Sequence, residues 1–156
     1  MKSITHDVFS LGVGLYVAYY LERPPVLLFL LVVWLALAVN EVIDVLGHVP
    51  RLGRPARSFW THSIFTAPVW GAATALASAY ILGSLLGGGF TTPQVLFVLG
   101  IGILVAYSHL LLDALTEGGV FLGRRRLALA HFRYDNIILN CVFAAVGVLL
   151  LFAVFV

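Results

Sequence analysis

Five long apolar stretches dominate the sequence and limit what it can fold into. They cover about residues 4–21, 26–46, 63–86, 94–115 and 137–156. Each is close to the roughly 20 residues that an α-helix needs to cross the hydrocarbon core of a bilayer. Hydrophobic residues make up 62% of the chain and charged residues only 10%, against roughly 45–50% and about 25% in soluble domains. The sequence therefore predicts an all-α polytopic membrane bundle of about five transmembrane helices, with residues 1–156 forming a single domain.

The basic residues predict the orientation of this bundle. With five spans, eight of the nine lysines and arginines fall on the side of the N-terminus, and Arg23 alone falls on the other. The eight are Lys2, Arg51, Arg54, Arg57, Arg124, Arg125, Arg126 and Arg133. Because basic residues favour the cytoplasmic face of a membrane, we expect a multi-pass cell-membrane protein with its N-terminus inside and its C-terminus outside.

The third stretch carries a stripe of small residues at every fourth position. Its members are Ser63, Ala67, Gly71, Ala75, Ala79, Gly83 and Gly87. Small residues at this spacing allow helix backbones to approach closely in lipid. The stripe predicts a helix that packs centrally in the bundle, or a contact face in a homo-oligomer.

The histidines and acids gather on the predicted cytoplasmic side and share helix faces. All five histidines and six of the seven acids fall there. Asp44 and His48 are four residues apart, as are His109 and Asp113, so each pair shares one helix face. Bundles build metal sites from such pairs on neighbouring helices. We therefore take Asp44, His48, His62, His109 and Asp113 as candidate metal ligands.

The depth of these residues strengthens that interpretation. Counting about 20 residues from the start of the second and fourth stretches places Asp44, His109 and Asp113 within the apolar slab. A charged group there costs about 2.5–3.5 kcal/mol even on the most lenient scale. A divalent cation would offset this cost, and a buried His–Asp proton relay is the alternative. Glu41, three residues before Asp44, is a candidate general base.

Motifs that are absent, and the arrangement of the remaining charged residues, narrow the range of functions. The chain has no His-Glu-x-x-His, no Gly-x-Ser-x-Gly and no P-loop. It therefore lacks the motifs of zinc metalloproteases, of α/β-hydrolase esterases and of P-loop nucleotide hydrolases. Its basic residues form no compact module that would bind nucleic acid. The run from Arg124 to Arg126 either sets topology and attracts anionic headgroups or clamps a phosphate, and Arg54 and Arg57 allow the same two interpretations. His131 and Asp135 are interpreted as interfacial residues, with Asp135 paired to Arg133.

Three segments together resemble a known family. Thr61-His62-Ser63 follows a basic loop, Ser108-His109-Leu110-Leu111-Leu112-Asp113-Ala114-Leu115-Thr116-Glu117-Gly118 closes the fourth stretch, and His6 lies early in the first. This pattern resembles the YdjM-type family of membrane-bound metal-dependent hydrolases and related archaeal membrane proteins of uncharacterised function. The resemblance covers roughly residues 4–125. It departs from the family pattern at residues 40–48 and 57–60.

The resemblance implies that His6, Asp44, His62, His109 and Asp113 are the polar site residues. Together with the spacing, it predicts a metal-dependent hydrolase whose site faces the cytoplasm at the membrane interface. We expect a divalent ion, zinc or manganese, because the ligands mix imidazole and carboxylate. Membrane lipids are the expected partners, and a lipid or lipid-linked phosphoester is the expected substrate, with Arg57 or the run from Arg124 to Arg126 holding the phosphate. The alternative is a non-enzymatic metal- or proton-handling membrane protein, either a transporter or a structural protein.

Overall fold

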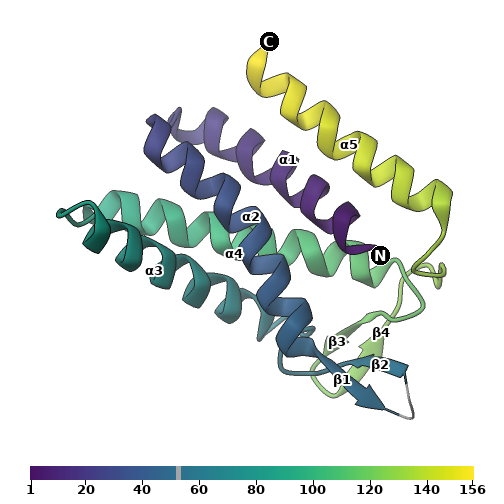
Figure 1. Cartoon of the computed structure of the whole chain (residues 1–156). Helices are drawn as coiled ribbons and strands as arrows, with labels where there is room; N and C mark the ends of the chain where they lie inside the picture. Colours follow the sequence, from purple (N-terminus) through teal and green to yellow (C-terminus); the bar gives the residue numbers. More distant parts are fainter. Residues whose placement is uncertain (52–53) are drawn as a thin grey trace.

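A computed structural model describes residues 1–51 and 54–156, and the chain forms a bundle of five helices (Figure 1). The helices are α1 (Ser3–Glu22), α2 (Val26–Gly47), α3 (Ala67–Leu85), α4 (Thr92–Ala114) and α5 (Ile137–Phe155). The predicted all-α bundle is confirmed, and four of the five predicted stretches begin and end within a few residues of a helix. The third starts later than predicted, at Ala67 instead of Ser63, because the segment before it forms turns.

Four of these helices, α2 to α5, are long and apolar enough to cross a membrane, so the chain is a membrane protein. α1 is of similar length, but its first two turns carry Ser3, Thr5, His6 and Asp7. It packs against α2, α4 and α5, and runs alongside them through the bundle (Figure 1). Its role as a fifth span stays a prediction.

The helices alternate in direction, which brings separate parts of the chain to one end of the bundle. We call this the polar end. It contains the N-terminus and the two segments that join α2 to α3 and α4 to α5 (Figure 1). These segments form two antiparallel hairpins that the sequence analysis did not predict: β1 (His48–Arg51) pairs with β2 (Arg54–Arg57), and β3 (Val120–Leu122) pairs with β4 (Arg125–Leu127). The eight basic residues all lie at this end. That the polar end faces the cytoplasm stays a prediction.

The small-residue stripe packs against a neighbouring helix of the same chain. Five of its members are buried along α3: Ala67, Gly71, Ala75, Ala79 and Gly83. At the closest approach, a Cβ added to Gly71 would overlap the carbonyl oxygen of Gly102 on α4, and the converse also holds. The prediction of close helix packing is confirmed. The expected central position is wrong, since α3 lies at one edge of the bundle against α4 and α2 (Figure 1).

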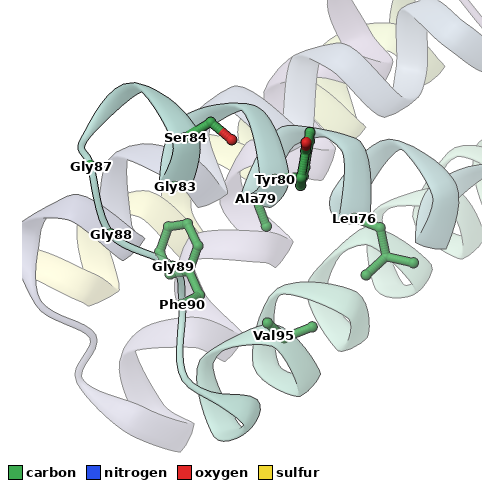
Figure 2. Close-up of a pocket in the computed structure, with 10 residues that line it drawn as sticks. All are labelled: Leu76, Ala79, Tyr80, Gly83, Ser84, Gly87, Gly88, Gly89, Phe90 and Val95. Atoms are coloured by element: carbon green, nitrogen blue, oxygen red, sulfur yellow. The ribbon is translucent and has the colours of Figure 1, made fainter.

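The opposite end, which we call the glycine end, contains the short α3–α4 connection. Gly87, Gly88 and Gly89 form this turn, and Gly87 adopts a left-handed conformation with φ of 69°. A pocket of about 540 Å³ lies between the end of α3 and the start of α4. Figure 2 shows it lined by Leu76, Phe90, Val95 and small residues, with Tyr80 and Ser84 as its polar side chains.

Buried polar residues are confined to the half of the bundle next to the polar end. Within the described residues they are Thr5, His6, Ser10, Asn40, Thr61, His62, Ser63, Ser108, His109, Asp113, Thr116 and Asn140. The main hydrophobic core, which includes residues of all five helices, fills the rest of the interior. Any chemistry that needs buried polar groups is therefore located at the polar end.

Candidate metal centre

Histidines and carboxylates from four parts of the chain meet at the polar end. His6 comes from the first turn of α1, Asp44 from the last turn of α2, and His109 and Asp113 from the last two turns of α4. His62 belongs to the turn segment before α3. Because the helices alternate in direction, these helix ends lie together and their side chains point toward one another. The predicted gathering of these five residues is therefore found in the fold.

The innermost four side chains are spaced as metal ligands are. Asp44 Oδ1 lies 3.6 Å from His62 Nε2 and 3.5 Å from His109 Nε2. Asp113 Oδ2 lies 3.5 Å from each of the same two nitrogens. Ligands about 2.0–2.2 Å from a tetrahedral zinc are separated by about 3.3–3.6 Å, whereas neighbouring ligands of an octahedral ion at about 2.1 Å are only about 3 Å apart. We call these four residues the inner group, and these four nitrogen–oxygen distances match those between ligands of a four-coordinate ion.

Three atoms of the inner group are buried and lack a hydrogen-bond partner among the described residues. They are His62 Nε2, His109 Nε2 and Asp113 Oδ2. Both histidine side chains are 0% exposed. A buried polar group without a partner costs about 1–3 kcal/mol, and more when it is charged. Three such atoms around one point are expected where a bound ion supplies the missing interaction.

The other ring nitrogen of each inner histidine is held by a hydrogen bond. His109 Nδ1 donates to Asn40 Oδ1 at 3.1 Å, and His62 Nδ1 lies 2.8 Å from Thr61 Oγ1, which can accept from it. Because the amide oxygen of Asn40 can only accept, His109 carries its proton on Nδ1 and turns an Nε2 lone pair toward two carboxylate oxygens. His62 has the same arrangement when its Nδ1 donates to Thr61. Lone pairs and carboxylates repel one another unless a cation lies between them. Metal-binding histidines are oriented in the same way in proteins generally.

Asn40 is itself fixed by a buried polar network. Its side-chain nitrogen donates to Asp7 Oδ1 at 3.0 Å, and its oxygen also accepts from Ser10 Oγ at 3.4 Å. Ser10 shares a 2.7 Å hydrogen bond with Ser108 on α4. These contacts join α1, α2 and α4 behind His109. Asn40 was not among the predicted site residues, although a polar residue within an apolar stretch is a signal that could have identified it.

The second oxygen of Asp113 is surrounded by donors. Arg57 Nη2 donates to Asp113 Oδ1 at 2.5 Å, His6 Nε2 lies 3.2 Å away, and the amino group of Met1 lies 3.1 Å away. The guanidinium of Arg57 also donates to Thr116 Oγ1 and to the carbonyl of Gly119, each at 3.0 Å. Arg57 thus neutralises and orients the carboxylate from the side opposite the inner group.

Glycines make room for these side chains. A Cβ at Gly118 would overlap the guanidinium of Arg57, so a larger residue would displace the arginine from Asp113. A Cβ at Gly47, the last residue of α2, would overlap Thr61 and the ring of His62. Both glycines therefore leave space that the side chains of the centre occupy.

The remaining predicted ligands lie around the inner group. His6 stacks on His109 with ring centroids 4.1 Å apart, and its Nδ1 is buried without a hydrogen-bond partner in the described structure. His48 is exposed, with Nδ1 3.6 Å from Asp44 Oδ1 and 2.9 Å from the backbone oxygen of Asp44. Two groups can hold a metal ion by the proximity of their ligand atoms: His6, His109 and Asp113, and Asp44, His48 and His62.

Burial also controls the protonation of His62, which lies outside the helices. Loss of solvent lowers the pKa of the His62 imidazole below its usual value. The ring is therefore neutral at neutral pH, the form in which histidine binds a metal.

Other predicted residues lie outside the inner group. Glu41 is exposed on α2, and its role as a base stays a prediction. His131 is exposed in the α4–α5 segment and takes no part in the centre. Asp135 pairs with Arg133 at 2.9 Å, as expected.

A pocket of about 680 Å³ opens beside the centre. Its walls are three arginines and six other residues: Arg57, Arg126, Arg133, Met1, His48, Thr116, Glu117, Gly118 and Tyr134. His48 and Arg57 connect the pocket to the centre, since they contact Asp44 and Asp113 respectively. A small molecule in this pocket would therefore be adjacent to the inner carboxylates.

The sequence profile of a family described as proteins of unknown function, DUF1286, matches residues 1–112. The match includes His6, Asp44, His48, His62 and His109, and it ends one residue before Asp113. No curated protein and no solved structure matches the chain significantly.

Proposed function

We propose that the chain, which belongs to the DUF1286 family, is a membrane-embedded metal-dependent hydrolase acting on a lipid or lipid-linked phosphoester. One observation carries the proposal: buried nitrogen and oxygen atoms of His62, His109 and Asp113, which have no hydrogen-bond partner among the described residues, converge beside a pocket. A structural cluster would satisfy these atoms internally, because unsatisfied buried polar groups are costly. The likeness of its motifs to the YdjM-type hydrolases supports the same reaction class.

We propose one ion, held by the inner group. Zinc fits this position best and manganese is the second choice, because a set of two imidazoles and two carboxylates suits zinc. Arg57 and His6 already surround the other oxygen of Asp113, where a second ion would otherwise bind. A bound zinc ion supplies Lewis acidity and lowers the pKa of a coordinated water toward 7.

The protein residues have separate roles in this proposal. The inner histidines and carboxylates hold the ion, while Asn40 and Thr61 fix the histidine rings. Arg57 holds Asp113 and lines the pocket, where its guanidinium also faces the substrate. Glu41 or Glu117 accepts the proton from water; Glu117 lines the pocket and Glu41 does not.

Transport is less well supported than hydrolysis. A transporter needs polar groups along a path through the bilayer. Among the described residues, the buried polar network reaches Ser10 and Ser108 and is followed toward the glycine end by apolar core. The centre therefore suits a reaction at one membrane surface. From the distribution of basic residues, we propose that this surface is cytoplasmic.

Elemental analysis of the purified full chain tests the metal first. We expect about one zinc per chain after loading, and loss of that zinc in His109→Ala and Asp113→Ala. His131→Ala and Asp135→Ala are matched controls, since they remove the same residue types at the same end outside the inner group. Absence of bound metal in the loaded wild type, or its retention in both inner variants, would overturn the proposal.

Hydrolysis is tested with the same proteins in mixed micelles. Release of inorganic phosphate from phosphatidic acid and from a lipid diphosphate should require zinc, stop with chelation and return on adding zinc back. A wild type that binds zinc and hydrolyses neither substrate would leave a metal-binding protein without the proposed activity on these lipid phosphoesters.

A further inference from the structure

The pocket beside the metal centre has a strongly cationic lining. Its side chains include the guanidinium groups of Arg57, Arg126 and Arg133, against one carboxylate, that of Glu117. Arg57 is already engaged by Asp113 and Thr116. Arg126 has no ion pair among the described residues, and Arg133 shares an exposed pair with Asp135. Two arginines are therefore available to a ligand.

The position of these arginines separates them from the rest of the basic run. Arg126 lines the pocket from β4, and Arg133 lines it from the segment before α5. Arg124 and Arg125 precede Arg126 directly in the sequence but do not line the pocket. If the arginine run only set the membrane topology or attracted anionic headgroups, none of its three arginines would need to line a pocket. The pocket thus gives Arg126 a role that its two neighbours lack.

The loops of the polar end, which also supply the pocket, carry exposed apolar side chains. Trp60, Leu129 and Phe132 are exposed in the loops of the polar end, and Tyr134 both lines the pocket and is exposed. Aromatic and apolar side chains mixed with arginines are typical of the headgroup layer of a membrane. A ligand reaching this pocket from the bilayer would carry its polar group at the level of the arginines.

We propose that Arg126 and Arg133 bind the phosphate group of a lipid or lipid-linked molecule in this pocket, next to the metal centre. Arginine is suited to this because its planar guanidinium donates two parallel hydrogen bonds to phosphate oxygens. That the bound phosphate is also the group hydrolysed rests on the proposed function; the binding itself does not.

Binding, measured without turnover, tests this pocket. Calorimetry on zinc-loaded full chain in detergent would use three probes: inorganic phosphate, glycerol 3-phosphate and a short-chain phosphatidic acid. We expect all three to bind, with the lipid probe at least about tenfold tighter because its acyl chains can contact the exposed apolar side chains of these loops. Equal affinity for the lipid probe and for glycerol 3-phosphate would overturn the lipid assignment, and no binding of any probe would overturn the pocket.

Matched arginine variants locate the binding. Arg126→Ala and Arg133→Ala should each weaken the binding of phosphatidic acid about tenfold or more, because each removes a charge-assisted contact. Arg124→Ala removes the same charge from the same run and should leave the affinity unchanged. An equal loss in Arg124→Ala, or no loss in the other two variants, would mean that a general surface charge binds the lipid.

The phosphate pocket and the proposed hydrolase function can succeed or fail independently of each other. Zinc content is measured in every variant and should stay at the wild-type level, since no contact of Arg126 or Arg133 with the inner group is found in the described part of the chain. If the chain holds no zinc and yet binds phosphatidic acid through Arg126, the hydrolase proposal fails and the phosphate pocket stands. If zinc binds and phosphate does not, the pocket proposal fails and the metal centre stands.

Discussion

The two ends of the bundle have pockets of comparable size and very different surroundings. The pocket at the glycine end measures about 540 Å³ and that at the polar end about 680 Å³. Behind the first lie Ala79 and Gly83, which are buried and apolar (Figure 2). Behind the second lie Asp113 and two histidines with unpartnered atoms. Pocket size therefore does not identify a site here; the unsatisfied buried groups behind the pocket do.

The difference also shows how each end is held together. At the glycine end, the contacts are the close packing of α3 on α4 and a turn whose shape depends on glycine. At the polar end, hydrogen bonds and ion pairs join segments as distant as Arg57 and Asp113. The glycine end is stabilised by close helix packing, and the polar end by hydrogen bonds and ion pairs. Substitutions at the two ends should accordingly affect different measurements.

The largest effect is expected from Asp44→Asn, which removes the charge of an inner ligand while keeping its shape. A ligand should matter more than the residues that orient the histidines, whose loss lowers metal affinity about 10–100-fold, so zinc affinity should fall by more than about 100-fold. Ser84→Ala, at the glycine-end pocket, is the control and should bind zinc like the wild type. Competition with a chelator of known affinity measures both. A tightly zinc-binding Asp44→Asn protein would remove Asp44 from the inner group.

Asn40→Leu should have the next largest effect. Loss of the residue that orients a metal-binding histidine typically lowers metal affinity about 10–100-fold. Ser78 provides the control position. Its hydroxyl also accepts a side-chain hydrogen bond, from Trp34 Nε1 at 3.0 Å, but this contact lies on the outer surface of the bundle. Ser78→Ala should leave the zinc affinity unchanged. If Asn40→Leu also leaves it unchanged, the hydrogen bond to His109 is not what orients that ring.

Gly71→Ala tests the packing of α3 on α4 without touching the centre. Its new methyl group would overlap the carbonyl oxygen of Gly102, and overpacking of this kind costs about 1–3 kcal/mol. We expect a melting temperature lower by several degrees and normal zinc content below the transition. Gly100→Ala is the control on α4, since a Cβ there meets nothing within 4 Å. A zinc loss in Gly71→Ala at low temperature would show that this packing positions the ligands.

The sequence predicted the centre through regular helix geometry and failed where that geometry stops. His109 and Asp113 are one turn apart on α4, so their convergence followed from spacing alone. Glu41 was placed on the same face as Asp44, yet it is exposed, because 100° of rotation per residue puts it beyond the buried stripe that includes Asn40. Spacing along one helix does not show where that stripe ends.

Contacts between distant segments were outside the reach of the sequence. The pairing of Arg57 with Asp113 depends on the β1–β2 hairpin, and the Thr61–His62 hydrogen bond lies in a turn without a regular period. Gly118 gave no local sign that it makes room for Arg57. The sequence thus predicted which residues gather at the polar end, but not which of their atoms face one another.

The smallest effect is expected at the turn of the glycine end. Gly87 has a φ of 69°, and an alanine there is strained by about 1 kcal/mol, whereas Gly88 has no positive φ and a Cβ there meets open space. Gly87→Ala should lower the melting temperature by a few degrees, and Gly88→Ala should leave it unchanged. Neither should alter zinc content or phosphate binding, because this turn and the centre lie at opposite ends of the bundle (Figure 1). A loss of zinc in Gly88→Ala would mean that the two ends are coupled through α3 and α4, and the contrast between them would no longer separate shape from chemistry.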